Sequence, residues 1–173
     1  MKIKLTLAIA AALMVSAPVH AETLITGPAR VLDGDTLDLG PVRVRLFGID
    51  APEGGQTCGL ADGSEWDCGK AATDRLAELA DGQSLDCAPV DRDRYGRIIA
   101  DCFLDGVNLG ETLVRDGLAW SYRRYSRDYV PAETAAKTAR RGVSGKARQS
   151  LHGISGSSSG NRKNSVDWEA LAG

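Results

Sequence analysis

Apolar and polar residues alternate over several short segments of the chain. Residues 42–46 alternate most regularly, which would place Val44 and Leu46 on one side of a strand and Arg43 and Arg45 on the other. Segments of this character predict five strands, at about residues 24–32, 36–39, 42–47, 84–90 and 97–103.

Helical spacing replaces this alternation in three places. Between the third and fourth predicted strands, residues 69–80 carry apolar residues at helical intervals. A second helix is expected over residues 109–116 and should end at Gly117. A third is expected to follow Val130 and to end at Gly142. The apolar face of the first helix would consist of Ala72, Leu76, Leu79 and Ala80.

This order of segments predicts a fold. Five short strands with one helix inserted late and further helices at the end are typical of a small closed barrel of the oligonucleotide-binding (OB) type. We therefore predict an α+β fold, mainly β, with a five-stranded OB-fold barrel and three helices. The fold alone does not specify an activity.

The two ends of the chain differ from this patterned part. Two lysines, an apolar run over residues 5–15 and small residues up to Ala21 predict a cleaved secretory signal over residues 1–21. An uncleaved anchor is the alternative, but the run is shorter than the roughly 20 residues that span a bilayer. We expect one folded OB-type domain over residues 22–143, a flexible Ser/Gly-rich tail over 144–173, and export to the periplasm or outside the cell.

The net charge bears on nucleic-acid binding, and the four cysteines bear on disulfide formation. Loss of Lys2 and Lys4 with the signal would leave 19 of the 21 basic residues against 23 acidic ones, a formal charge of −4. This balance argues weakly against nucleic-acid binding, although a local basic cluster can still oppose phosphate. Four cysteines in an exported chain favour two disulfides over a zinc site. Their positions in a loop and in two strand-like segments favour the pairs Cys58–Cys68 and Cys87–Cys102.

Acidic residues gather around the second and third predicted strands. Asp33-Gly-Asp-Thr36 places Asp33 and Asp35 two residues apart, either as ligands of a common cation or as caps of a glycine-centred turn. Asp50 and the carbonyl of Ala51 follow in a proline-containing bend. With Asp35 they offer the oxygen ligands that calcium prefers. Glu53 could orient or deprotonate a water there, or could simply be solvated.

Arginines accompany these acids. Arg45 precedes the bend, and Asp91-Arg-Asp-Arg-Tyr-Gly-Arg97 brings a second guanidinium through a tight turn. Guanidinium groups match phosphate oxygens and stabilise the extra charge of a phosphoryl transition state. The alternative for residues 91–97 is a hairpin tip with internal ion pairs.

Four motifs in order resemble the staphylococcal nuclease (thermonuclease) family over about residues 24–142. They are Asp33-Gly-Asp-Thr36, Arg45-Leu-Phe-Gly-Ile-Asp-Ala-Pro-Glu53, Asp93-Arg-Tyr-Gly-Arg97, and Asn108 with Leu113-Val-Arg-Asp-Gly-Leu-Ala-Trp120. The resemblance implies a five-stranded OB barrel with three helices. It also implies calcium-assisted hydrolysis of single- or double-stranded DNA and RNA that leaves 3′-phosphate ends, by a monomer with no stable protein partner.

The resemblance also assigns roles to individual residues. It implies Asp35, Asp50 and the Ala51 carbonyl as Ca²⁺ ligands, with Asp33 behind them. Glu53 would be the base, and Arg45 and Arg97 would bind phosphate. Arg94 and Tyr95 match positions that touch nucleotide, and Tyr122 or Tyr125 would stack on a base; packing beneath the last helix is the alternative for both.

Three features depart from the family pattern. Ala51 stands where threonine is common, which is harmless if only the carbonyl binds. The four cysteines are additions, and residues 142–145 lack the tryptophan that usually follows the last helix. Two competing hypotheses remain: a catalytically inactive OB-fold module that binds nucleic acid, and a secreted structural module, which would leave the four ordered motifs unexplained.

Overall fold

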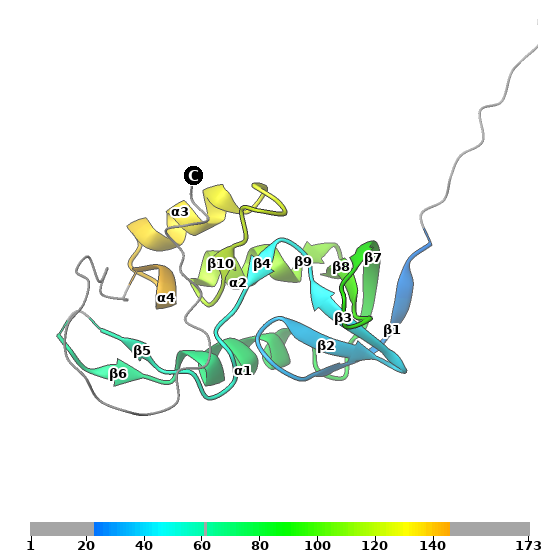
Figure 1. Ribbon diagram of the computed structural model, residues 1–173, viewed down its shortest axis with the longest axis horizontal. Helices are drawn as coiled ribbons and strands as arrows, with labels where there is room; N and C mark the ends of the chain where they lie inside the picture. The colour runs from blue at the N-terminus through cyan, green and yellow to red at the C-terminus, as the bar shows by residue number, and fades with distance from the viewer. Residues whose placement is uncertain (1–22, 61, 146–173) are drawn as a thin grey trace, which may run out of the picture.

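The computed structural model describes residues 23–60 and 62–145 of the 173-residue chain. The expected signal and residues 146–173 of the expected tail lie outside this part. Five strands form a barrel in the order β3–β2–β1–β7–β8, closed by parallel pairing of β3 with β8 (Figure 1). The barrel strands are β1 (Ile25–Val31), β2 (Thr36–Leu39), β3 (Val42–Leu46), β7 (Ser84–Arg92) and β8 (Ile98–Leu104).

The alternation along the strands places apolar side chains inside the barrel. On β3, Val44 and Leu46 are buried while Arg43 is exposed, as the pattern predicts. β7 pairs with β8 in an antiparallel register that shifts between Pro89 and Asp91. Proline has no backbone N–H to donate to the ladder, so a shift at this point is expected. The α+β fold with a closed five-stranded barrel is confirmed.

Helix α1 (Cys68–Ala80) closes one end of the barrel. The Asp67 carboxylate accepts a hydrogen bond from the Lys70 backbone N–H and caps the first turn. Of the predicted apolar face, Ala72, Leu76 and Ala80 are fully buried, and Leu79 packs against the same core.

Helices α2 (Leu109–Asp116) and α3 (Val130–Thr138) pack on each other beside the barrel (Figure 1). Asn108 caps α2, and Gly117 ends it in the left-handed conformation. The buried Tyr129 joins these parts, because its hydroxyl donates to Asp101 at 2.7 Å and accepts from Asn108 at 3.0 Å.

The expected end of the third helix is wrong. α3 stops at Thr138, and the chain reverses at Arg140, which has a φ of 52°. Gly142 instead begins a fourth short helix, α4 (Gly142–Gly145), so the described residues contain four helices rather than three. The buried Val143 donates its backbone N–H to the Gly117 carbonyl at 2.7 Å, which docks α4 against the end of α2. This contact lies within residues 142–145, which lack the tryptophan that the resemblance leads one to expect.

Three short pairings escaped prediction. β4 (Ile49–Asp50) pairs with β10 (Trp120–Ser121), β5 (Cys58–Gly59) pairs with β6 (Glu65–Trp66), and β9 (Val107–Asn108) extends β8. Two-residue strands carry no alternation that a sequence pattern can detect. The β4–β10 pair matters most, because it sets Trp120 opposite Asp50.

Both predicted disulfides form. Cys87–Cys102 links directly paired residues of β7 and β8 inside the barrel. Cys58–Cys68 ties the β5–β6 hairpin to the first residue of α1. The hairpin projects from the body of the molecule in Figure 1.

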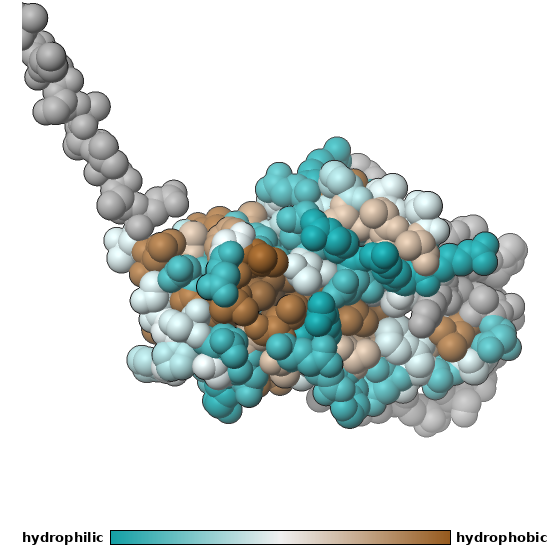
Figure 2. Space-filling view, turned by 180° about the vertical axis from the view of Figure 1, so that it is seen from behind, coloured by the Kyte–Doolittle hydropathy of each residue, from teal (hydrophilic) through white to brown (hydrophobic). Residues whose placement is uncertain are grey.

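On the face shown in Figure 2, apolar residues gather on one part of the surface, with mainly polar residues around them. No helix within the described residues is long and apolar enough to cross a membrane.

Candidate active site

The centre of the site is a guanidinium between two carboxylates. Arg45, on the outward side of β3, contacts both oxygens of Asp35, with Nη1 at 3.1 Å from Oδ1 and Nη2 at 2.7 Å from Oδ2. The same Nη2 donates to Asp50 Oδ1 at 2.8 Å. Strand β3 therefore fixes one cation against acids from two separate segments of the chain.

Asp35 lies in a tight turn that enters β2. The Asp33 carboxylate accepts the Asp35 backbone N–H at 3.1 Å, so Asp33 caps the turn from behind the buried Asp35. Gly34 is required here, because an added Cβ would lie 2.8 Å from Ala72 Cβ and 2.9 Å from Ala51 Cβ. The turn-cap interpretation of the motif therefore applies to Asp33, whereas Asp35 pairs with Arg45.

Burial shifts the proton equilibria of both acids. Burial raises the pKa of Asp35 to about 7, because the loss of solvation, with the nearby charges of Asp33 and Asp50, outweighs the attraction of Arg45. Burial also raises the pKa of Asp50 despite its hydrogen bond to Arg45. For Arg45 itself, burial alone would lower the pKa, but the two carboxylates reverse this effect and raise it. One arginine thus only partly compensates the acids around it.

The carboxylates of Asp35 and Asp50 are the kind of oxygen donors that suit a hard cation. One nitrogen of Arg45 bridges Asp35 and Asp50 at 2.7 and 2.8 Å, close to the roughly 2.3–2.6 Å at which calcium binds oxygen. The half-exposed Asp50 and the nearly buried Ala51 follow each other at the end of β4. Within the described residues no cluster of three or more His, Cys, Asp or Glu side chains could hold a metal. Backbone carbonyl, water and substrate oxygens would therefore have to complete the shell.

Glu53 lies in a loop anchored to α1. Its backbone N–H donates to the Gln56 side chain at 3.1 Å, and its carbonyl accepts the Gln56 N–H at 2.9 Å. Gly69 packs so closely that an added Cβ would lie 1.8 Å from the Glu53 carbonyl oxygen. The Glu53 side chain is exposed, and within residues 23–60 and 62–145 its carboxylate makes no hydrogen bond or ion pair.

The hairpin tip between β7 and β8 holds the second arginine. Arg97 donates from Nε to Asp93 at 2.7 Å and approaches the Thr36 hydroxyl through Nη1 at 3.4 Å. Because that hydroxyl donates to Asp35 Oδ1 at 2.9 Å, a chain of polar contacts runs from Arg97 to Asp35. The internal ion pair of the alternative interpretation exists, and it orients Arg97 toward the site.

Aromatic side chains surround the same opening. A cavity of about 550 Å³ is lined by Arg45, Asp50 and Arg97, and the four predicted nucleotide-contacting residues also line it. Tyr95 is 70% exposed beneath Arg94, whose guanidinium lies 4.8 Å from the ring centroid. The centroids of Tyr122 and Tyr125 are 5.0 Å apart. The predicted nucleotide-contacting residues are Arg94, Tyr95, Tyr122 and Tyr125.

The structure brings most predicted residues together but not all of them. Glu53 is absent from the cavity lining, and Asp35 lies behind Arg45 rather than on the cavity wall. Sequence reasoning missed Thr36, which links Asp35 to Arg97, although it belongs to the motif around Asp35. It also missed Gln56 and Gly69, which hold the Glu53 loop. A glycine as the first residue of the predicted helix was the only sign of that close approach.

The protein is thus an OB barrel with a charged cavity, which Arg45, Asp50 and Arg97 line and behind which Asp35 pairs with Arg45. Residues 43–144 match the family model described as staphylococcal nuclease homologue. Since that match covers more than half of the chain, the protein belongs to the staphylococcal nuclease family.

Relatives in bacteria carry differing names. The chain is 37% identical over 106 residues to an uncharacterized endonuclease of Escherichia coli, covering 58% of this chain and 63% of that protein. It is 34% identical over 139 residues to the succinoglycan biosynthesis protein ExoI of Rhizobium meliloti (strain 1021), covering 79% and 73%. It is also 34% identical over 134 residues to the micrococcal nuclease of Shigella flexneri, covering 69% and 70%. The first alignment spans less than two thirds of the relative's length.

Proposed function

We propose that the protein is an exported, calcium-dependent endonuclease that hydrolyses phosphodiester bonds of DNA and RNA and leaves 3′-phosphate ends. The observation that carries the proposal is the bridge of Arg45 between Asp35 and Asp50 at a cavity that Arg97 also lines. Membership of the nuclease family and the nuclease names of two relatives support it. The two disulfides agree with export.

The metal would be held by Asp35, Asp50 and the Ala51 carbonyl. When bound, calcium supplies positive charge that neutralises a phosphate oxygen. With the acids engaged in this way, Arg45 would keep only part of its pairing with them. Its fork can turn to the phosphate, where it stabilises charge that builds in the transition state.

The other residues position the phosphate and the water. Arg97 holds the phosphate from the hairpin side, and its ion pair with Asp93 restricts the guanidinium to one orientation. Glu53 accepts a proton from the attacking water, which requires its exposed side chain to swing toward Asp50 once substrate is bound. Tyr122 and Tyr125 offer faces on which a base stacks without sequence preference.

An OB-fold module that binds nucleic acid without cutting it is the alternative. It is favoured by one observation, which is the position of the Glu53 side chain outside the cavity. The two proposals share the binding surface and differ only in the chemical step.

Cleavage assays on single-stranded DNA and RNA separate them. The oxidised protein should cut both with calcium and neither with a chelator. Glu53→Gln should lower turnover by about 10²- to 10⁴-fold while the variant still binds substrate. Binding by the wild-type protein without calcium-dependent cutting would establish the inactive module instead.

A further inference from the structure

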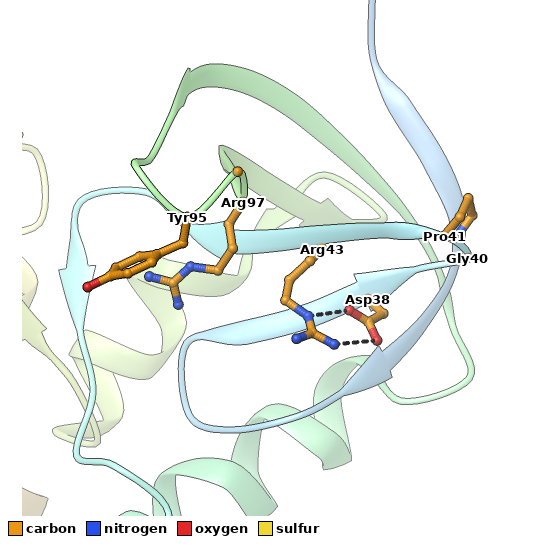
Figure 3. A pocket seen from close by; sticks show the side chains of 7 residues that line it. Asp38, Gly40, Pro41, Arg43, Tyr95 and Arg97 are labelled. Atoms are coloured by element: carbon orange, nitrogen blue, oxygen red, sulfur yellow. Dashed lines mark hydrogen bonds and ion pairs between the residues drawn. The ribbon is translucent and has the colours of Figure 1, made fainter.

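A second cavity adjoins the candidate active site on the β2–β3 side. It has a volume of about 470 Å³ and shares Tyr95 and Arg97 with the first cavity. Figure 3 shows Arg43 extending from β3 to Asp38, and Arg97 extending from the hairpin tip beside the Tyr95 ring. The remaining lining residues are Asp38, Gly40, Pro41 and Gly96.

Ion pairing across the strands of the sheet does not account for all the positive charge around this cavity. Asp38 pairs with Arg43 across β2 and β3 at 2.9 Å and with Arg30 across β1 and β2 at 2.6 Å. One carboxylate thus faces two arginines, and exposed pairs of this kind contribute only about 0–1 kcal/mol. Cross-strand pairing explains the position of Asp38, but it leaves one positive charge uncompensated.

Both arginines of the cavity retain a nitrogen for a ligand. Arg43 uses Nε and Nη2 on Asp38, and Arg97 uses Nε on Asp93 and Nη1 on Thr36. In the described part of the chain, Arg43 Nη1 and Arg97 Nη2 make no hydrogen bond. Arg43 is 53% exposed, so an anion can reach it from solvent.

The spacing matches a polynucleotide. Arg43 and Arg45 are two residues apart on β3 and lie on the same side, which separates them by about 6.6 Å along the strand. This is comparable to one nucleotide step of an extended single strand. We propose that the cavity lined by Arg43, Tyr95 and Arg97 is a second subsite, which binds the phosphate next to the scissile one. The inference rests on the proposed function, because it takes the phosphate at Arg45 and Arg97 as the point of cleavage.

Arg30 provides a matched control. It pairs with the same Asp38 and carries the same charge, but it lies on β1 and does not line the cavity. Arg43→Ala and Arg30→Ala therefore remove equal charge from one cluster, and only the first removes a contact within the proposed subsite. Circular dichroism would establish that both variants are folded.

The test compares thymidine dinucleotides with trinucleotides, with cleavage at each bond resolved by product analysis. For the wild-type protein and Arg30→Ala, adding a nucleotide on one side of the cut bond should raise kcat/KM. In Arg43→Ala this gain should fall about three- to tenfold. Equal gains in Arg43→Ala and Arg30→Ala would overturn the subsite.

A binding measurement keeps the inference separate from catalysis. Binding of a short single-stranded oligonucleotide in the presence of chelator should depend on salt with a slope that is smaller by about 0.7 in Arg43→Ala than in Arg30→Ala. If the wild-type protein binds but does not cut, the proposed function fails and this slope alone decides the subsite. Identical slopes in the two variants would refute it.

Discussion

The candidate site has one half carried by barrel strands and another carried by loops. In the barrel half, Arg45 is 22% exposed and is fixed by the ladder of β3 and by two carboxylates. In the loop half, Glu53 and Tyr95 are exposed, and their positions depend on contacts outside the sheet. The barrel thus places Arg45, whereas Arg97 and the groups that meet water and base are placed by ion pairs and close packing of loops.

The largest effect is expected at Arg45. Arg45→Ala should lower kcat by about 10²- to 10³-fold, because a fork aimed at the transition-state charge is lost. It should also destabilise the protein, since Asp35 would be left buried without its cation. Arg45→Lys keeps the charge and should recover stability more than turnover. Steady-state kinetics and thermal unfolding measure both quantities, and a kcat within threefold of wild type in Arg45→Ala would contradict the assignment.

The next largest effect on kcat is expected from a substitution that displaces the Glu53 loop. Gly69→Ala puts a Cβ 1.8 Å from the Glu53 carbonyl oxygen, so the loop must move. We expect kcat to fall by at least about tenfold, because small displacements of a catalytic group are costly. Gly59→Ala is the control, since nothing lies within 4 Å of its added Cβ. Equal activities of the two variants would show that the position of the loop does not matter.

Loss of the two disulfides should have different effects. One should change stability alone, whereas the other should also change activity. Cys87–Cys102 joins barrel strands, and its replacement by two serines should cost about 3 kcal/mol with kcat unchanged. Cys58–Cys68 lies beside the Glu53 loop, where Cys68 contacts the Gln56 carbonyl at 3.3 Å. Its replacement should lower kcat severalfold in addition to stability. Denaturant unfolding and kinetics distinguish the two, and unchanged turnover in the second pair would make both bonds purely stabilising.

A smaller effect on stability and on calcium affinity is expected when the pH is changed. The folded protein raises the pKa of Asp35 to about 7 from its ordinary value near 3.8, so it binds this proton more tightly than the unfolded chain does. The resulting stabilisation of the calcium-free protein is present below pH 3.8 and is lost as pH rises to about 7. Asp35→Asn should flatten this part of the dependence of the melting temperature on pH. Calcium must displace the same proton, so its affinity should rise between pH 5 and 8, and a falling affinity would contradict the account.

Much of the fold follows from local patterns. The strand at residues 36–39 and the helix at 109–116 are predicted to the residue, because alternation and a glycine end signal specify them. The end of α3 is missed because Arg140 already adopts the left-handed conformation, two residues before Gly142 does so. That choice depends on docking of α4 against Gly117, which no local pattern records.

Prediction of the candidate site from the sequence is limited in the same way, because local patterns do not record contacts between distant residues. The motif residues of the barrel half come together as predicted, since the strand fixes their direction. The contacts of Thr36 with Arg97 and of Gly69 with the Glu53 loop join positions 61 and 16 residues apart, so they become visible only in three dimensions.

The most direct test of the central claim is calcium-dependent cleavage by wild type, Asp50→Asn and Asp86→Asn. Asp86 is an exposed acid on β7, outside the site, so the two variants change the net charge equally. The account predicts that Asp50→Asn needs at least tenfold more calcium or loses activity, while Asp86→Asn behaves as wild type. Equal calcium requirements of all three proteins would contradict a metal site at Asp35 and Asp50.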